Sequence, residues 1–76
     1  MNREKIKIAN KIGINPKEII FDLKSKSLYT TIDGKRVGCY YDEQLKTIVM
    51  YGDLQIAQYF IKGLIKLLDG LIQWKN

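Results

Sequence analysis

The sequence predicts an α+β domain with a short N-terminal helix, a four-stranded antiparallel meander and a long C-terminal helix packed on one face of the sheet. Three observations predict this fold. Apolar residues recur with helical spacing at both ends of the chain, they alternate with period two in the middle, and turn signals interrupt the middle at regular intervals. Because 76 residues are enough for only one core, we expect a single domain over residues 1–76.

The N-terminal helix is predicted over residues 2–12. Its apolar residues fall on one arc when they are placed at about 100° per residue. The opposite side is polar and carries Arg3, Lys7, Asn10 and Lys11. Gly13 ends the helix.

The segment after Gly13 allows two interpretations. Asn15-Pro16 followed by Glu18 is a helix-start signal, and the spacing of Ala9, Gly13, Ile14 and Ile19 resembles a bacterial helix-turn-helix. That resemblance would make residues 16–24 a recognition helix. Asp22, however, falls where the motif needs an apolar residue. Since Ile19 and Phe21 share a face at period two, we favour a strand over 18–22.

The middle of the chain contains an internal echo. The stretch FDLKSKSL at 21–28 matches YDEQLKTI at 41–48 as aromatic, Asp, three residues, Lys, Ser or Thr, and apolar, at an offset of 20 residues. Both stretches predict hairpin connections, and Asp33-Gly34 between them is a two-residue type I′ turn signal. The predicted strands are therefore 18–22, 27–32, 35–41 and 46–51.

The Asp33-Gly34 turn also predicts the register, because it pairs Ile32 with Lys35 and thereby Leu28 with Cys39. One face of the sheet is then almost wholly apolar and carries Ile19, Phe21, Leu28, Thr30, Ile32, Val37, Cys39, Tyr41, Ile48 and Met50. The other face is mixed and carries Ile20, Tyr29, Thr31, Arg36, Gly38, Tyr40, Thr47, Val49 and Tyr51. The apolar face is expected to receive the C-terminal helix.

The C-terminal helix is predicted over residues 53–74, with Asp53 as its cap. Its polar residues form one narrow stripe, and 15 of the 21 positions from 54 to 74 are apolar or Gly. This apolar arc is wider than one sheet face requires. The N-terminal helix, a membrane surface or a second copy could cover the rest. We favour a second copy and therefore a homodimer, with an interface formed by Phe60, Gly63, Leu64, Leu67, Gly70, Leu71 and Trp74.

The charge distribution indicates an acidic partner. The net charge is +5, and its whole excess lies in residues 1–38, where nine Lys or Arg residues face four Asp or Glu. DNA or RNA is the default partner of such a surface, while a merely solvated basic surface is the alternative. The candidate nucleic-acid-binding residues are Arg3, Lys7, Lys11, Lys35 and Arg36 for phosphates, and Tyr29 and Tyr40 for stacking on bases.

Catalysis is not expected, because the chain has no His and a single cysteine, Cys39, on the predicted core face. Asp22 and Asp42 are better explained as turn residues than as a metal or acid pair. We expect no catalytic residue, no metal, no cofactor, no small-molecule substrate and no membrane span, and a cytoplasmic location. The sequence thus favours a non-enzymatic, homodimeric nucleic-acid-binding or regulatory protein. The alternative is a protein-protein interaction module, an adaptor or inhibitor, that docks through its apolar C-terminal helix or its sheet edge.

Overall fold

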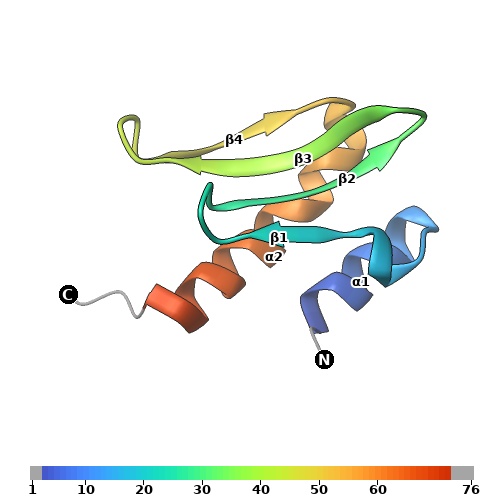
Figure 1. Ribbon diagram of the computed structural model, residues 1–76, viewed down its shortest axis with the longest axis horizontal. Coiled ribbons are helices and arrows are strands. Elements are labelled where there is room, and N and C mark those ends of the chain that lie inside the picture. The colour runs from blue at the N-terminus through green and yellow to red at the C-terminus, as the bar shows by residue number, and fades with distance from the viewer. Residues whose placement is uncertain (1–2, 73–76) are drawn as a thin grey trace.

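The computed structural model describes residues 3–72, and these residues form the predicted α+β architecture (Figure 1). The predicted element boundaries agree within two residues wherever the chain is described, while positions 2, 73 and 74 lie outside the described residues. The elements are, in order, α1 (Arg3–Ile12), the single 3₁₀ turn η1 (Pro16–Glu18), β1 (Ile20–Asp22), β2 (Ser27–Ile32), β3 (Lys35–Asp42), β4 (Thr47–Tyr51) and α2 (Leu54–Ile72).

The sheet is an antiparallel meander with the strand order β1-β2-β3-β4. Its register is the predicted one, since Leu28 pairs with Cys39 across the β2–β3 hairpin. Asp33 and Gly34 have φ angles of 52° and 78°, as a type I′ turn requires at both central positions. Cys39 in turn pairs with Met50, which lies on the edge strand β4 and stays 36% exposed although it belongs to the inner face.

The two echoed segments form the same hairpin loop. Asp22 Oδ1 accepts hydrogen bonds of 3.0 and 3.3 Å from two backbone N–H groups of its own loop. Asp42 Oδ1 accepts two equivalent bonds of 2.9 and 3.0 Å in the second loop. Each loop ends on a lysine in the left-handed region, Lys26 at φ 52° and Lys46 at φ 54°. The interpretation of both aspartates as turn residues is therefore confirmed.

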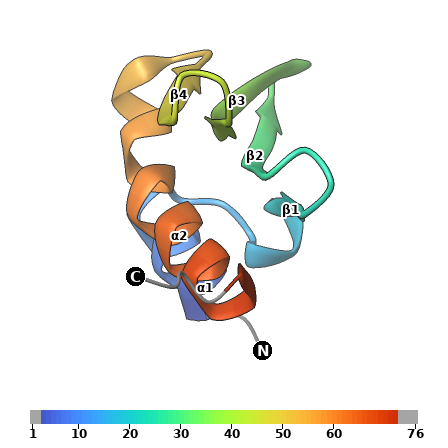
Figure 2. The same ribbon diagram turned by 90° about the vertical axis from the view of Figure 1, so that its left-hand side faces the viewer.

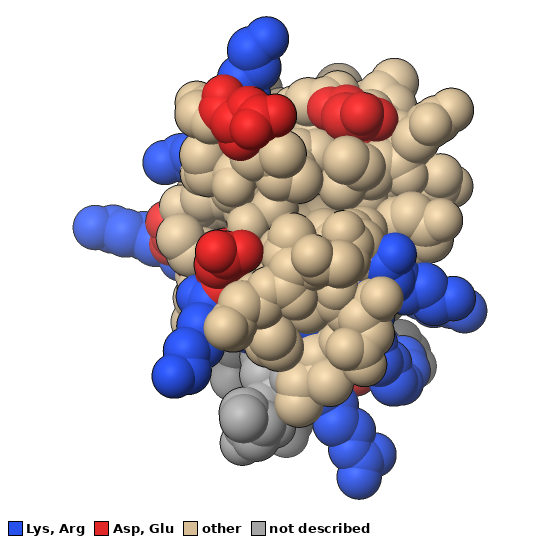
Figure 3. All heavy atoms as spheres, turned by 90° about the vertical axis from the view of Figure 1, so that its right-hand side faces the viewer, with Lys and Arg blue, Asp and Glu red and all other residues tan. Residues whose placement is uncertain are grey.

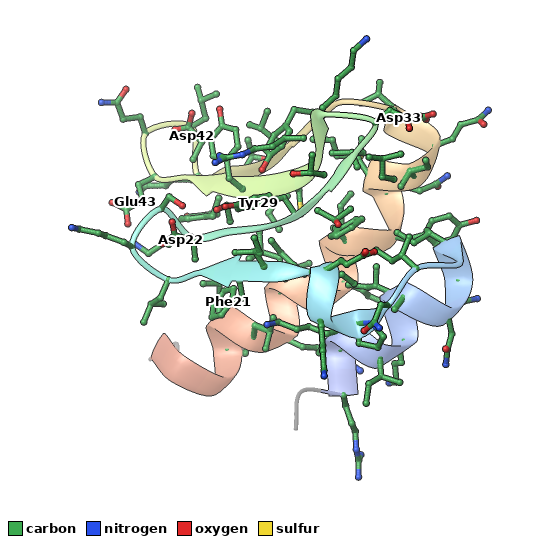
Figure 4. The ribbon with its side chains drawn as sticks, turned by 45° about the vertical axis from the view of Figure 1, so that its right-hand side comes forward. Phe21, Asp22, Tyr29, Asp33, Asp42 and Glu43 are labelled. Carbon is green, nitrogen blue, oxygen red and sulfur yellow. The ribbon has the colours of Figure 1, made fainter. Side chains whose placement is uncertain are left out.

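The two loops lie at the same end of the sheet and brace each other. The Lys26 ammonium forms an ion pair with the Glu43 carboxylate of the other loop. The Lys26 carbonyl also accepts a 2.9 Å hydrogen bond from the Tyr41 N–H. Figure 4 shows Asp22, Asp42 and Glu43 at this end and Asp33 at the opposite end. The meander thus has one end with two linked loops and one end with a single tight turn.

The segment after Gly13 contains both the helix start and the strand that the sequence indicates. The Asn15 side chain accepts a 2.9 Å hydrogen bond from the Lys17 N–H, so it caps a helical turn that lasts only from Pro16 to Glu18. The chain then becomes extended at Ile19, which is 2% exposed in the core. A recognition helix over 16–24 is therefore wrong. Burial of Ile19 outweighs the continuation of the helix.

The core lies between α2 and the inner face of the sheet, and α1 packs against α2 beside it. Figure 2 shows the sheet curving around α2 and α1 close to the lower part of α2. Full burial of a large apolar side chain stabilises the fold by about 1.5–3 kcal/mol. Eight buried apolar residues form this core and come from both helices, the segment before β1, and strands β2 and β3: Ile8, Ala9, Ile19, Leu28, Cys39, Phe60, Leu64 and Leu68.

The contact between α1 and α2 explains part of the wide apolar surface of α2. A Cβ atom at Gly63 would lie 2.9 Å from Ile8 Cδ1 and 3.1 Å from Leu28 Cδ2, so the missing side chain lets α1 and the sheet approach the same point of α2. Apart from its chain neighbours and the backbone of its own helix, Gly70 has no described heavy atom within 4 Å of such a Cβ. The polar stripe of α2 is exposed from Gln55 to Asp69, as are Leu54, Tyr59 and Ile65. Within residues 3–72, neither helix has the length and apolarity needed to cross a membrane.

Two glycines in different surroundings allow a test of the close approach of β2 and β3. A Cβ at Gly38 would lie 2.3 Å from the Leu28 carbonyl oxygen and 2.6 Å from Tyr29 Cα. We expect Gly38→Ala to lower the free energy of unfolding by about 1–3 kcal/mol, because backbone atoms must move. Gly70→Ala is the control, and it should raise the free energy of unfolding by about 1 kcal/mol through helix propensity alone. Urea unfolding measures both changes, and an unchanged midpoint for Gly38→Ala would contradict the close approach of β2 and β3.

Candidate functional site

A groove between α1 and α2 is bordered by four lysines. Lys7 and Lys11 come from α1, and Lys62 and Lys66 come from α2. The groove has a volume of about 380 Å³ and is open to solvent. Ile8 and Gly63, which are both buried, also line it at the contact of the two helices. The groove therefore joins an apolar base to a basic rim.

Helix geometry explains why the four lysines meet. Residues four apart lie on one side of a helix and about 6 Å apart along its axis. Lys7 and Lys11 have this spacing on α1, and Lys62 and Lys66 have it on α2. Because the small residue Gly63 allows α1 to lie close to α2, the two rows border the same groove. The helix contact thus turns two surface rows into one site.

The groove carries excess positive charge. Its charged lining consists of the four lysines and one carboxylate, that of Glu4. Gln58 and Tyr59 add polar groups that can donate hydrogen bonds. Lysine presents its charge on a long flexible stem, so several ammonium groups can converge on one anion. This arrangement suits a ligand with more than one negative charge.

Only part of the basic row predicted on α1 lines the groove. Arg3, Lys7 and Lys11 are all exposed, but only the two lysines line the groove. Lys62 and Lys66 were not among the predicted binding residues, since the sequence places them in the polar stripe of α2. Their four-residue spacing, matched to that of the α1 lysines, is the signal that could have suggested a shared site.

The β2–β3 hairpin places its predicted basic residues beside acidic ones. Lys35 and Arg36 are exposed and border a hollow of about 490 Å³ that Asp33 and Asp53 also line. On the face drawn in Figure 3, Lys and Arg side chains project around the periphery, and acidic side chains lie at the top and left of the centre. The lining at the hairpin tip is therefore balanced in charge, whereas the groove lining has four lysines against one carboxylate.

The outer face of the sheet carries an aromatic cluster. The Arg36 guanidinium carbon lies 4.4 Å from the centre of the Tyr29 ring, and the ring centres of Tyr40 and Tyr51 are 6.0 Å apart at 35°. Burial raises the pKa of Tyr51 and the charge on Arg36 opposes this rise. Tyr29 is only 8% exposed, so it offers little ring surface to a base. Tyr40 and Arg36 retain more accessible surface.

The dimer interface predicted on α2 stays a prediction. Phe60, Gly63 and Leu64 are buried within one chain, which leaves them little surface for a partner. Leu67 is half-buried against the core and Gly70 is exposed. The last two predicted positions give no further support, because the structure describes only the backbone of Leu71 and Trp74 lies outside the described residues.

Cys39 is a core residue in this structure. It is fully buried in β3, and burial raises the pKa of its thiol to about 12. The thiol is therefore protonated and inaccessible at neutral pH, which suits a small apolar side chain and opposes a nucleophile. Among residues 3–72, no three His, Cys, Asp or Glu side chains gather closely enough to hold a metal ion.

The buried thiol predicts a loss of stability in alkali. In the unfolded chain Cys39 ionises near its usual pKa of 9.0, whereas the folded chain keeps the proton up to about pH 12. The unfolded state therefore binds fewer protons above about pH 9, and the free energy of unfolding must fall as the pH rises. Urea titrations between about pH 8 and pH 10 measure this slope. Cys39→Ala should have a shallower slope over the same range, and an identical slope would contradict the assignment.

Comparisons with protein-family models, with curated proteins and with solved structures find no match for this chain.

Proposed function

We propose that this chain is a small, non-enzymatic nucleic-acid-binding protein that holds phosphate groups in the groove between α1 and α2. The observation that carries the proposal is the convergence of four lysines from two helices on one groove with a single carboxylate in its lining. Phosphate contacts position a nucleic acid but do not read its bases. The proposed activity is therefore sequence-tolerant binding, which suits a regulatory or architectural role.

The groove favours a phosphate backbone over a single compact anion. Its basic residues form two rows, Lys7 with Lys11 and Lys62 with Lys66, and each row runs along a helix. A linear polyanion can contact both members of a row, because successive negative charges follow the same direction. Arg3 extends the α1 row by one further turn and is exposed. One strand of DNA or RNA has this charge pattern.

The outer sheet face supplies a second, smaller support. Tyr40 and Arg36 provide an aromatic ring and a guanidinium on one surface, the combination on which unpaired bases stack. Tyr29 contributes indirectly, because its ring lies under the Arg36 guanidinium and limits the positions of that side chain. We place this surface second, since the β2–β3 hairpin beside it also carries acidic residues.

The proposal includes a cytoplasmic location. The chain has one cysteine and thus no possible internal disulfide, and Lys and Arg outnumber Asp and Glu by 13 to 8. A basic protein without disulfide stabilisation suits a reducing compartment that contains nucleic acid.

A protein-docking role is the second candidate, and the exposed apolar side chains of α2 favour it. Leu54, Tyr59 and Ile65 are all exposed on this helix. Apolar docking depends weakly on salt, whereas phosphate binding releases counterions and weakens steeply as salt rises. The salt dependence of binding therefore separates the two candidates.

The two lysines of α2 provide the sharpest test of the groove. We expect the double variant Lys62→Gln, Lys66→Gln to weaken binding to short single-stranded and double-stranded DNA at low salt. The slope of log K against log salt is negative, and it should become shallower by about 1 for each lost phosphate contact. Fluorescence anisotropy at several salt concentrations measures both quantities, with single-stranded RNA as a third probe.

The matched control changes the net charge equally at other exposed lysines. Lys17→Gln, Lys24→Gln alters two exposed lysines that do not line the groove, so it should change binding much less. Equal losses for the two double variants would show attraction by net charge alone and would overturn the groove. Absence of binding to all three nucleic acids at low salt would overturn the proposed function itself.

A further inference from the structure

The free edge of β4 is the second surface that stands out. β4 lies at one end of the strand order, and within residues 3–72 no further strand lies beside it (Figure 1). Its residues Thr47–Tyr51 include no charged residue, no proline and no glycine. Natural proteins commonly protect edge strands with charges, prolines or very short strands. The other edge, β1, has only three residues and ends on Asp22, so β1 has such protection and β4 does not.

We propose that two copies of this chain pair through β4 in an antiparallel arrangement, with Val49 at the twofold axis, to give one continuous sheet. A twofold axis perpendicular to the sheet keeps inner faces on the same side, so residues that share a face must oppose each other. Centring the pairing on Val49 is the register that pairs all five residues of the strand. Ile48 then lies opposite the partner's Met50, and Thr47 lies opposite the partner's Tyr51.

Side chains at this edge suit a second copy. Met50 belongs to the inner face but is 36% exposed at the edge. The partner's Ile48, an apolar side chain, would cover it. Ile48 and Val49 are both half-buried in one chain and would lose further exposed surface on pairing. Burial of apolar surface stabilises by about 25 cal/mol for each Å².

Charge at the two ends of β4 favours the same arrangement. Exposed Lys46 precedes the strand, and exposed Asp53 follows it after Gly52. The ladder stops at Thr47 and Tyr51, because Lys46 and Gly52 have positive φ angles of 54° and 81°. Antiparallel pairing still brings the Lys46 end of one strand to the Asp53 end of the partner strand. Because the axis repeats this contact, opposite charges meet at both ends of the shared edge. A parallel pairing would instead place Lys46 beside the partner's Lys46.

This dimer differs from the one predicted through α2, and it needs none of the α2 residues that are buried within one chain. It also leaves the groove between α1 and α2 open, because the groove lining contains no β4 residue. Dimerisation and phosphate binding can therefore succeed or fail independently.

A charge exchange at the axis tests the pairing. Val49→Lys places two lysines opposite each other, and Val49→Glu places two glutamates there, so each variant alone should be a monomer. An equimolar mixture should form a heterodimer. Sedimentation equilibrium should give twice the 8.9 kDa chain mass for the native chain and for the mixture, and the single mass for each variant. Ile20→Lys, at an exposed position on the β1 edge, is the matched control and should remain dimeric.

A cysteine cross-link keeps the test decisive if the charged variants fail to fold. Directly opposed Cα atoms in antiparallel strands are about 4.5–5.5 Å apart, within the range that a disulfide spans. Val49→Cys should therefore form a covalent dimer under oxidising conditions, while Ile20→Cys should form far less and native Cys39 is buried. A monomeric native chain, a dimer that survives Val49→Lys, or equal cross-linking at both positions would each overturn the proposal.

Discussion

The fold depends on one close contact, the point where α1, α2 and the sheet meet around Gly63. Ile8 Cδ1 and Leu28 Cδ2 would both press on a Cβ atom there, so any side chain would push apart two of the three elements. Ile8, Leu28 and Leu64 are nearly or fully buried, because α1 covers the part of the core that α2 and the sheet leave open. In a chain of 76 residues, which has room for only one core, loss of this contact would expose a large share of the apolar surface.

The same contact links stability to the candidate site. The lysines of α1 and α2 share a groove because the helices lie close together, and they lie close together because Gly63 has no side chain. Mutual repulsion of these lysines opposes the helix contact, and the apolar base of the groove offsets it. The clustered positive charge therefore lowers the stability of the folded chain, as is common at binding surfaces. A bound polyanion would remove the repulsion and stabilise the folded chain.

Local signals in the sequence were sufficient for most of the sheet. The Asp33-Gly34 turn determined the register, and the repeated Asp and Lys positions identified two identical loops, because both effects act within a few residues. Helix contacts were less accessible to prediction. Gly63 and Gly70 look alike in sequence, yet only Gly63 has close neighbours, and these come from α1 and β2. Lys62 and Lys66 likewise come near the α1 lysines only when the helices pack together. Because the two pairs are far apart in the sequence, no local pattern indicates that they share a groove.

The order of the elements also determines when the groove exists. Every strand pairs with its neighbour in sequence, through loops or turns of a few residues, whereas α1 and α2 stand at opposite ends of the described chain. The helix contact therefore closes the longest loop in the domain, a loop that contains the whole sheet. A chain with a complete meander but an undocked α1 has the same composition and net charge as the native protein. Such a chain lacks the groove. The proposed binding surface therefore exists only in the fully folded chain, although the net charge is the same in both states.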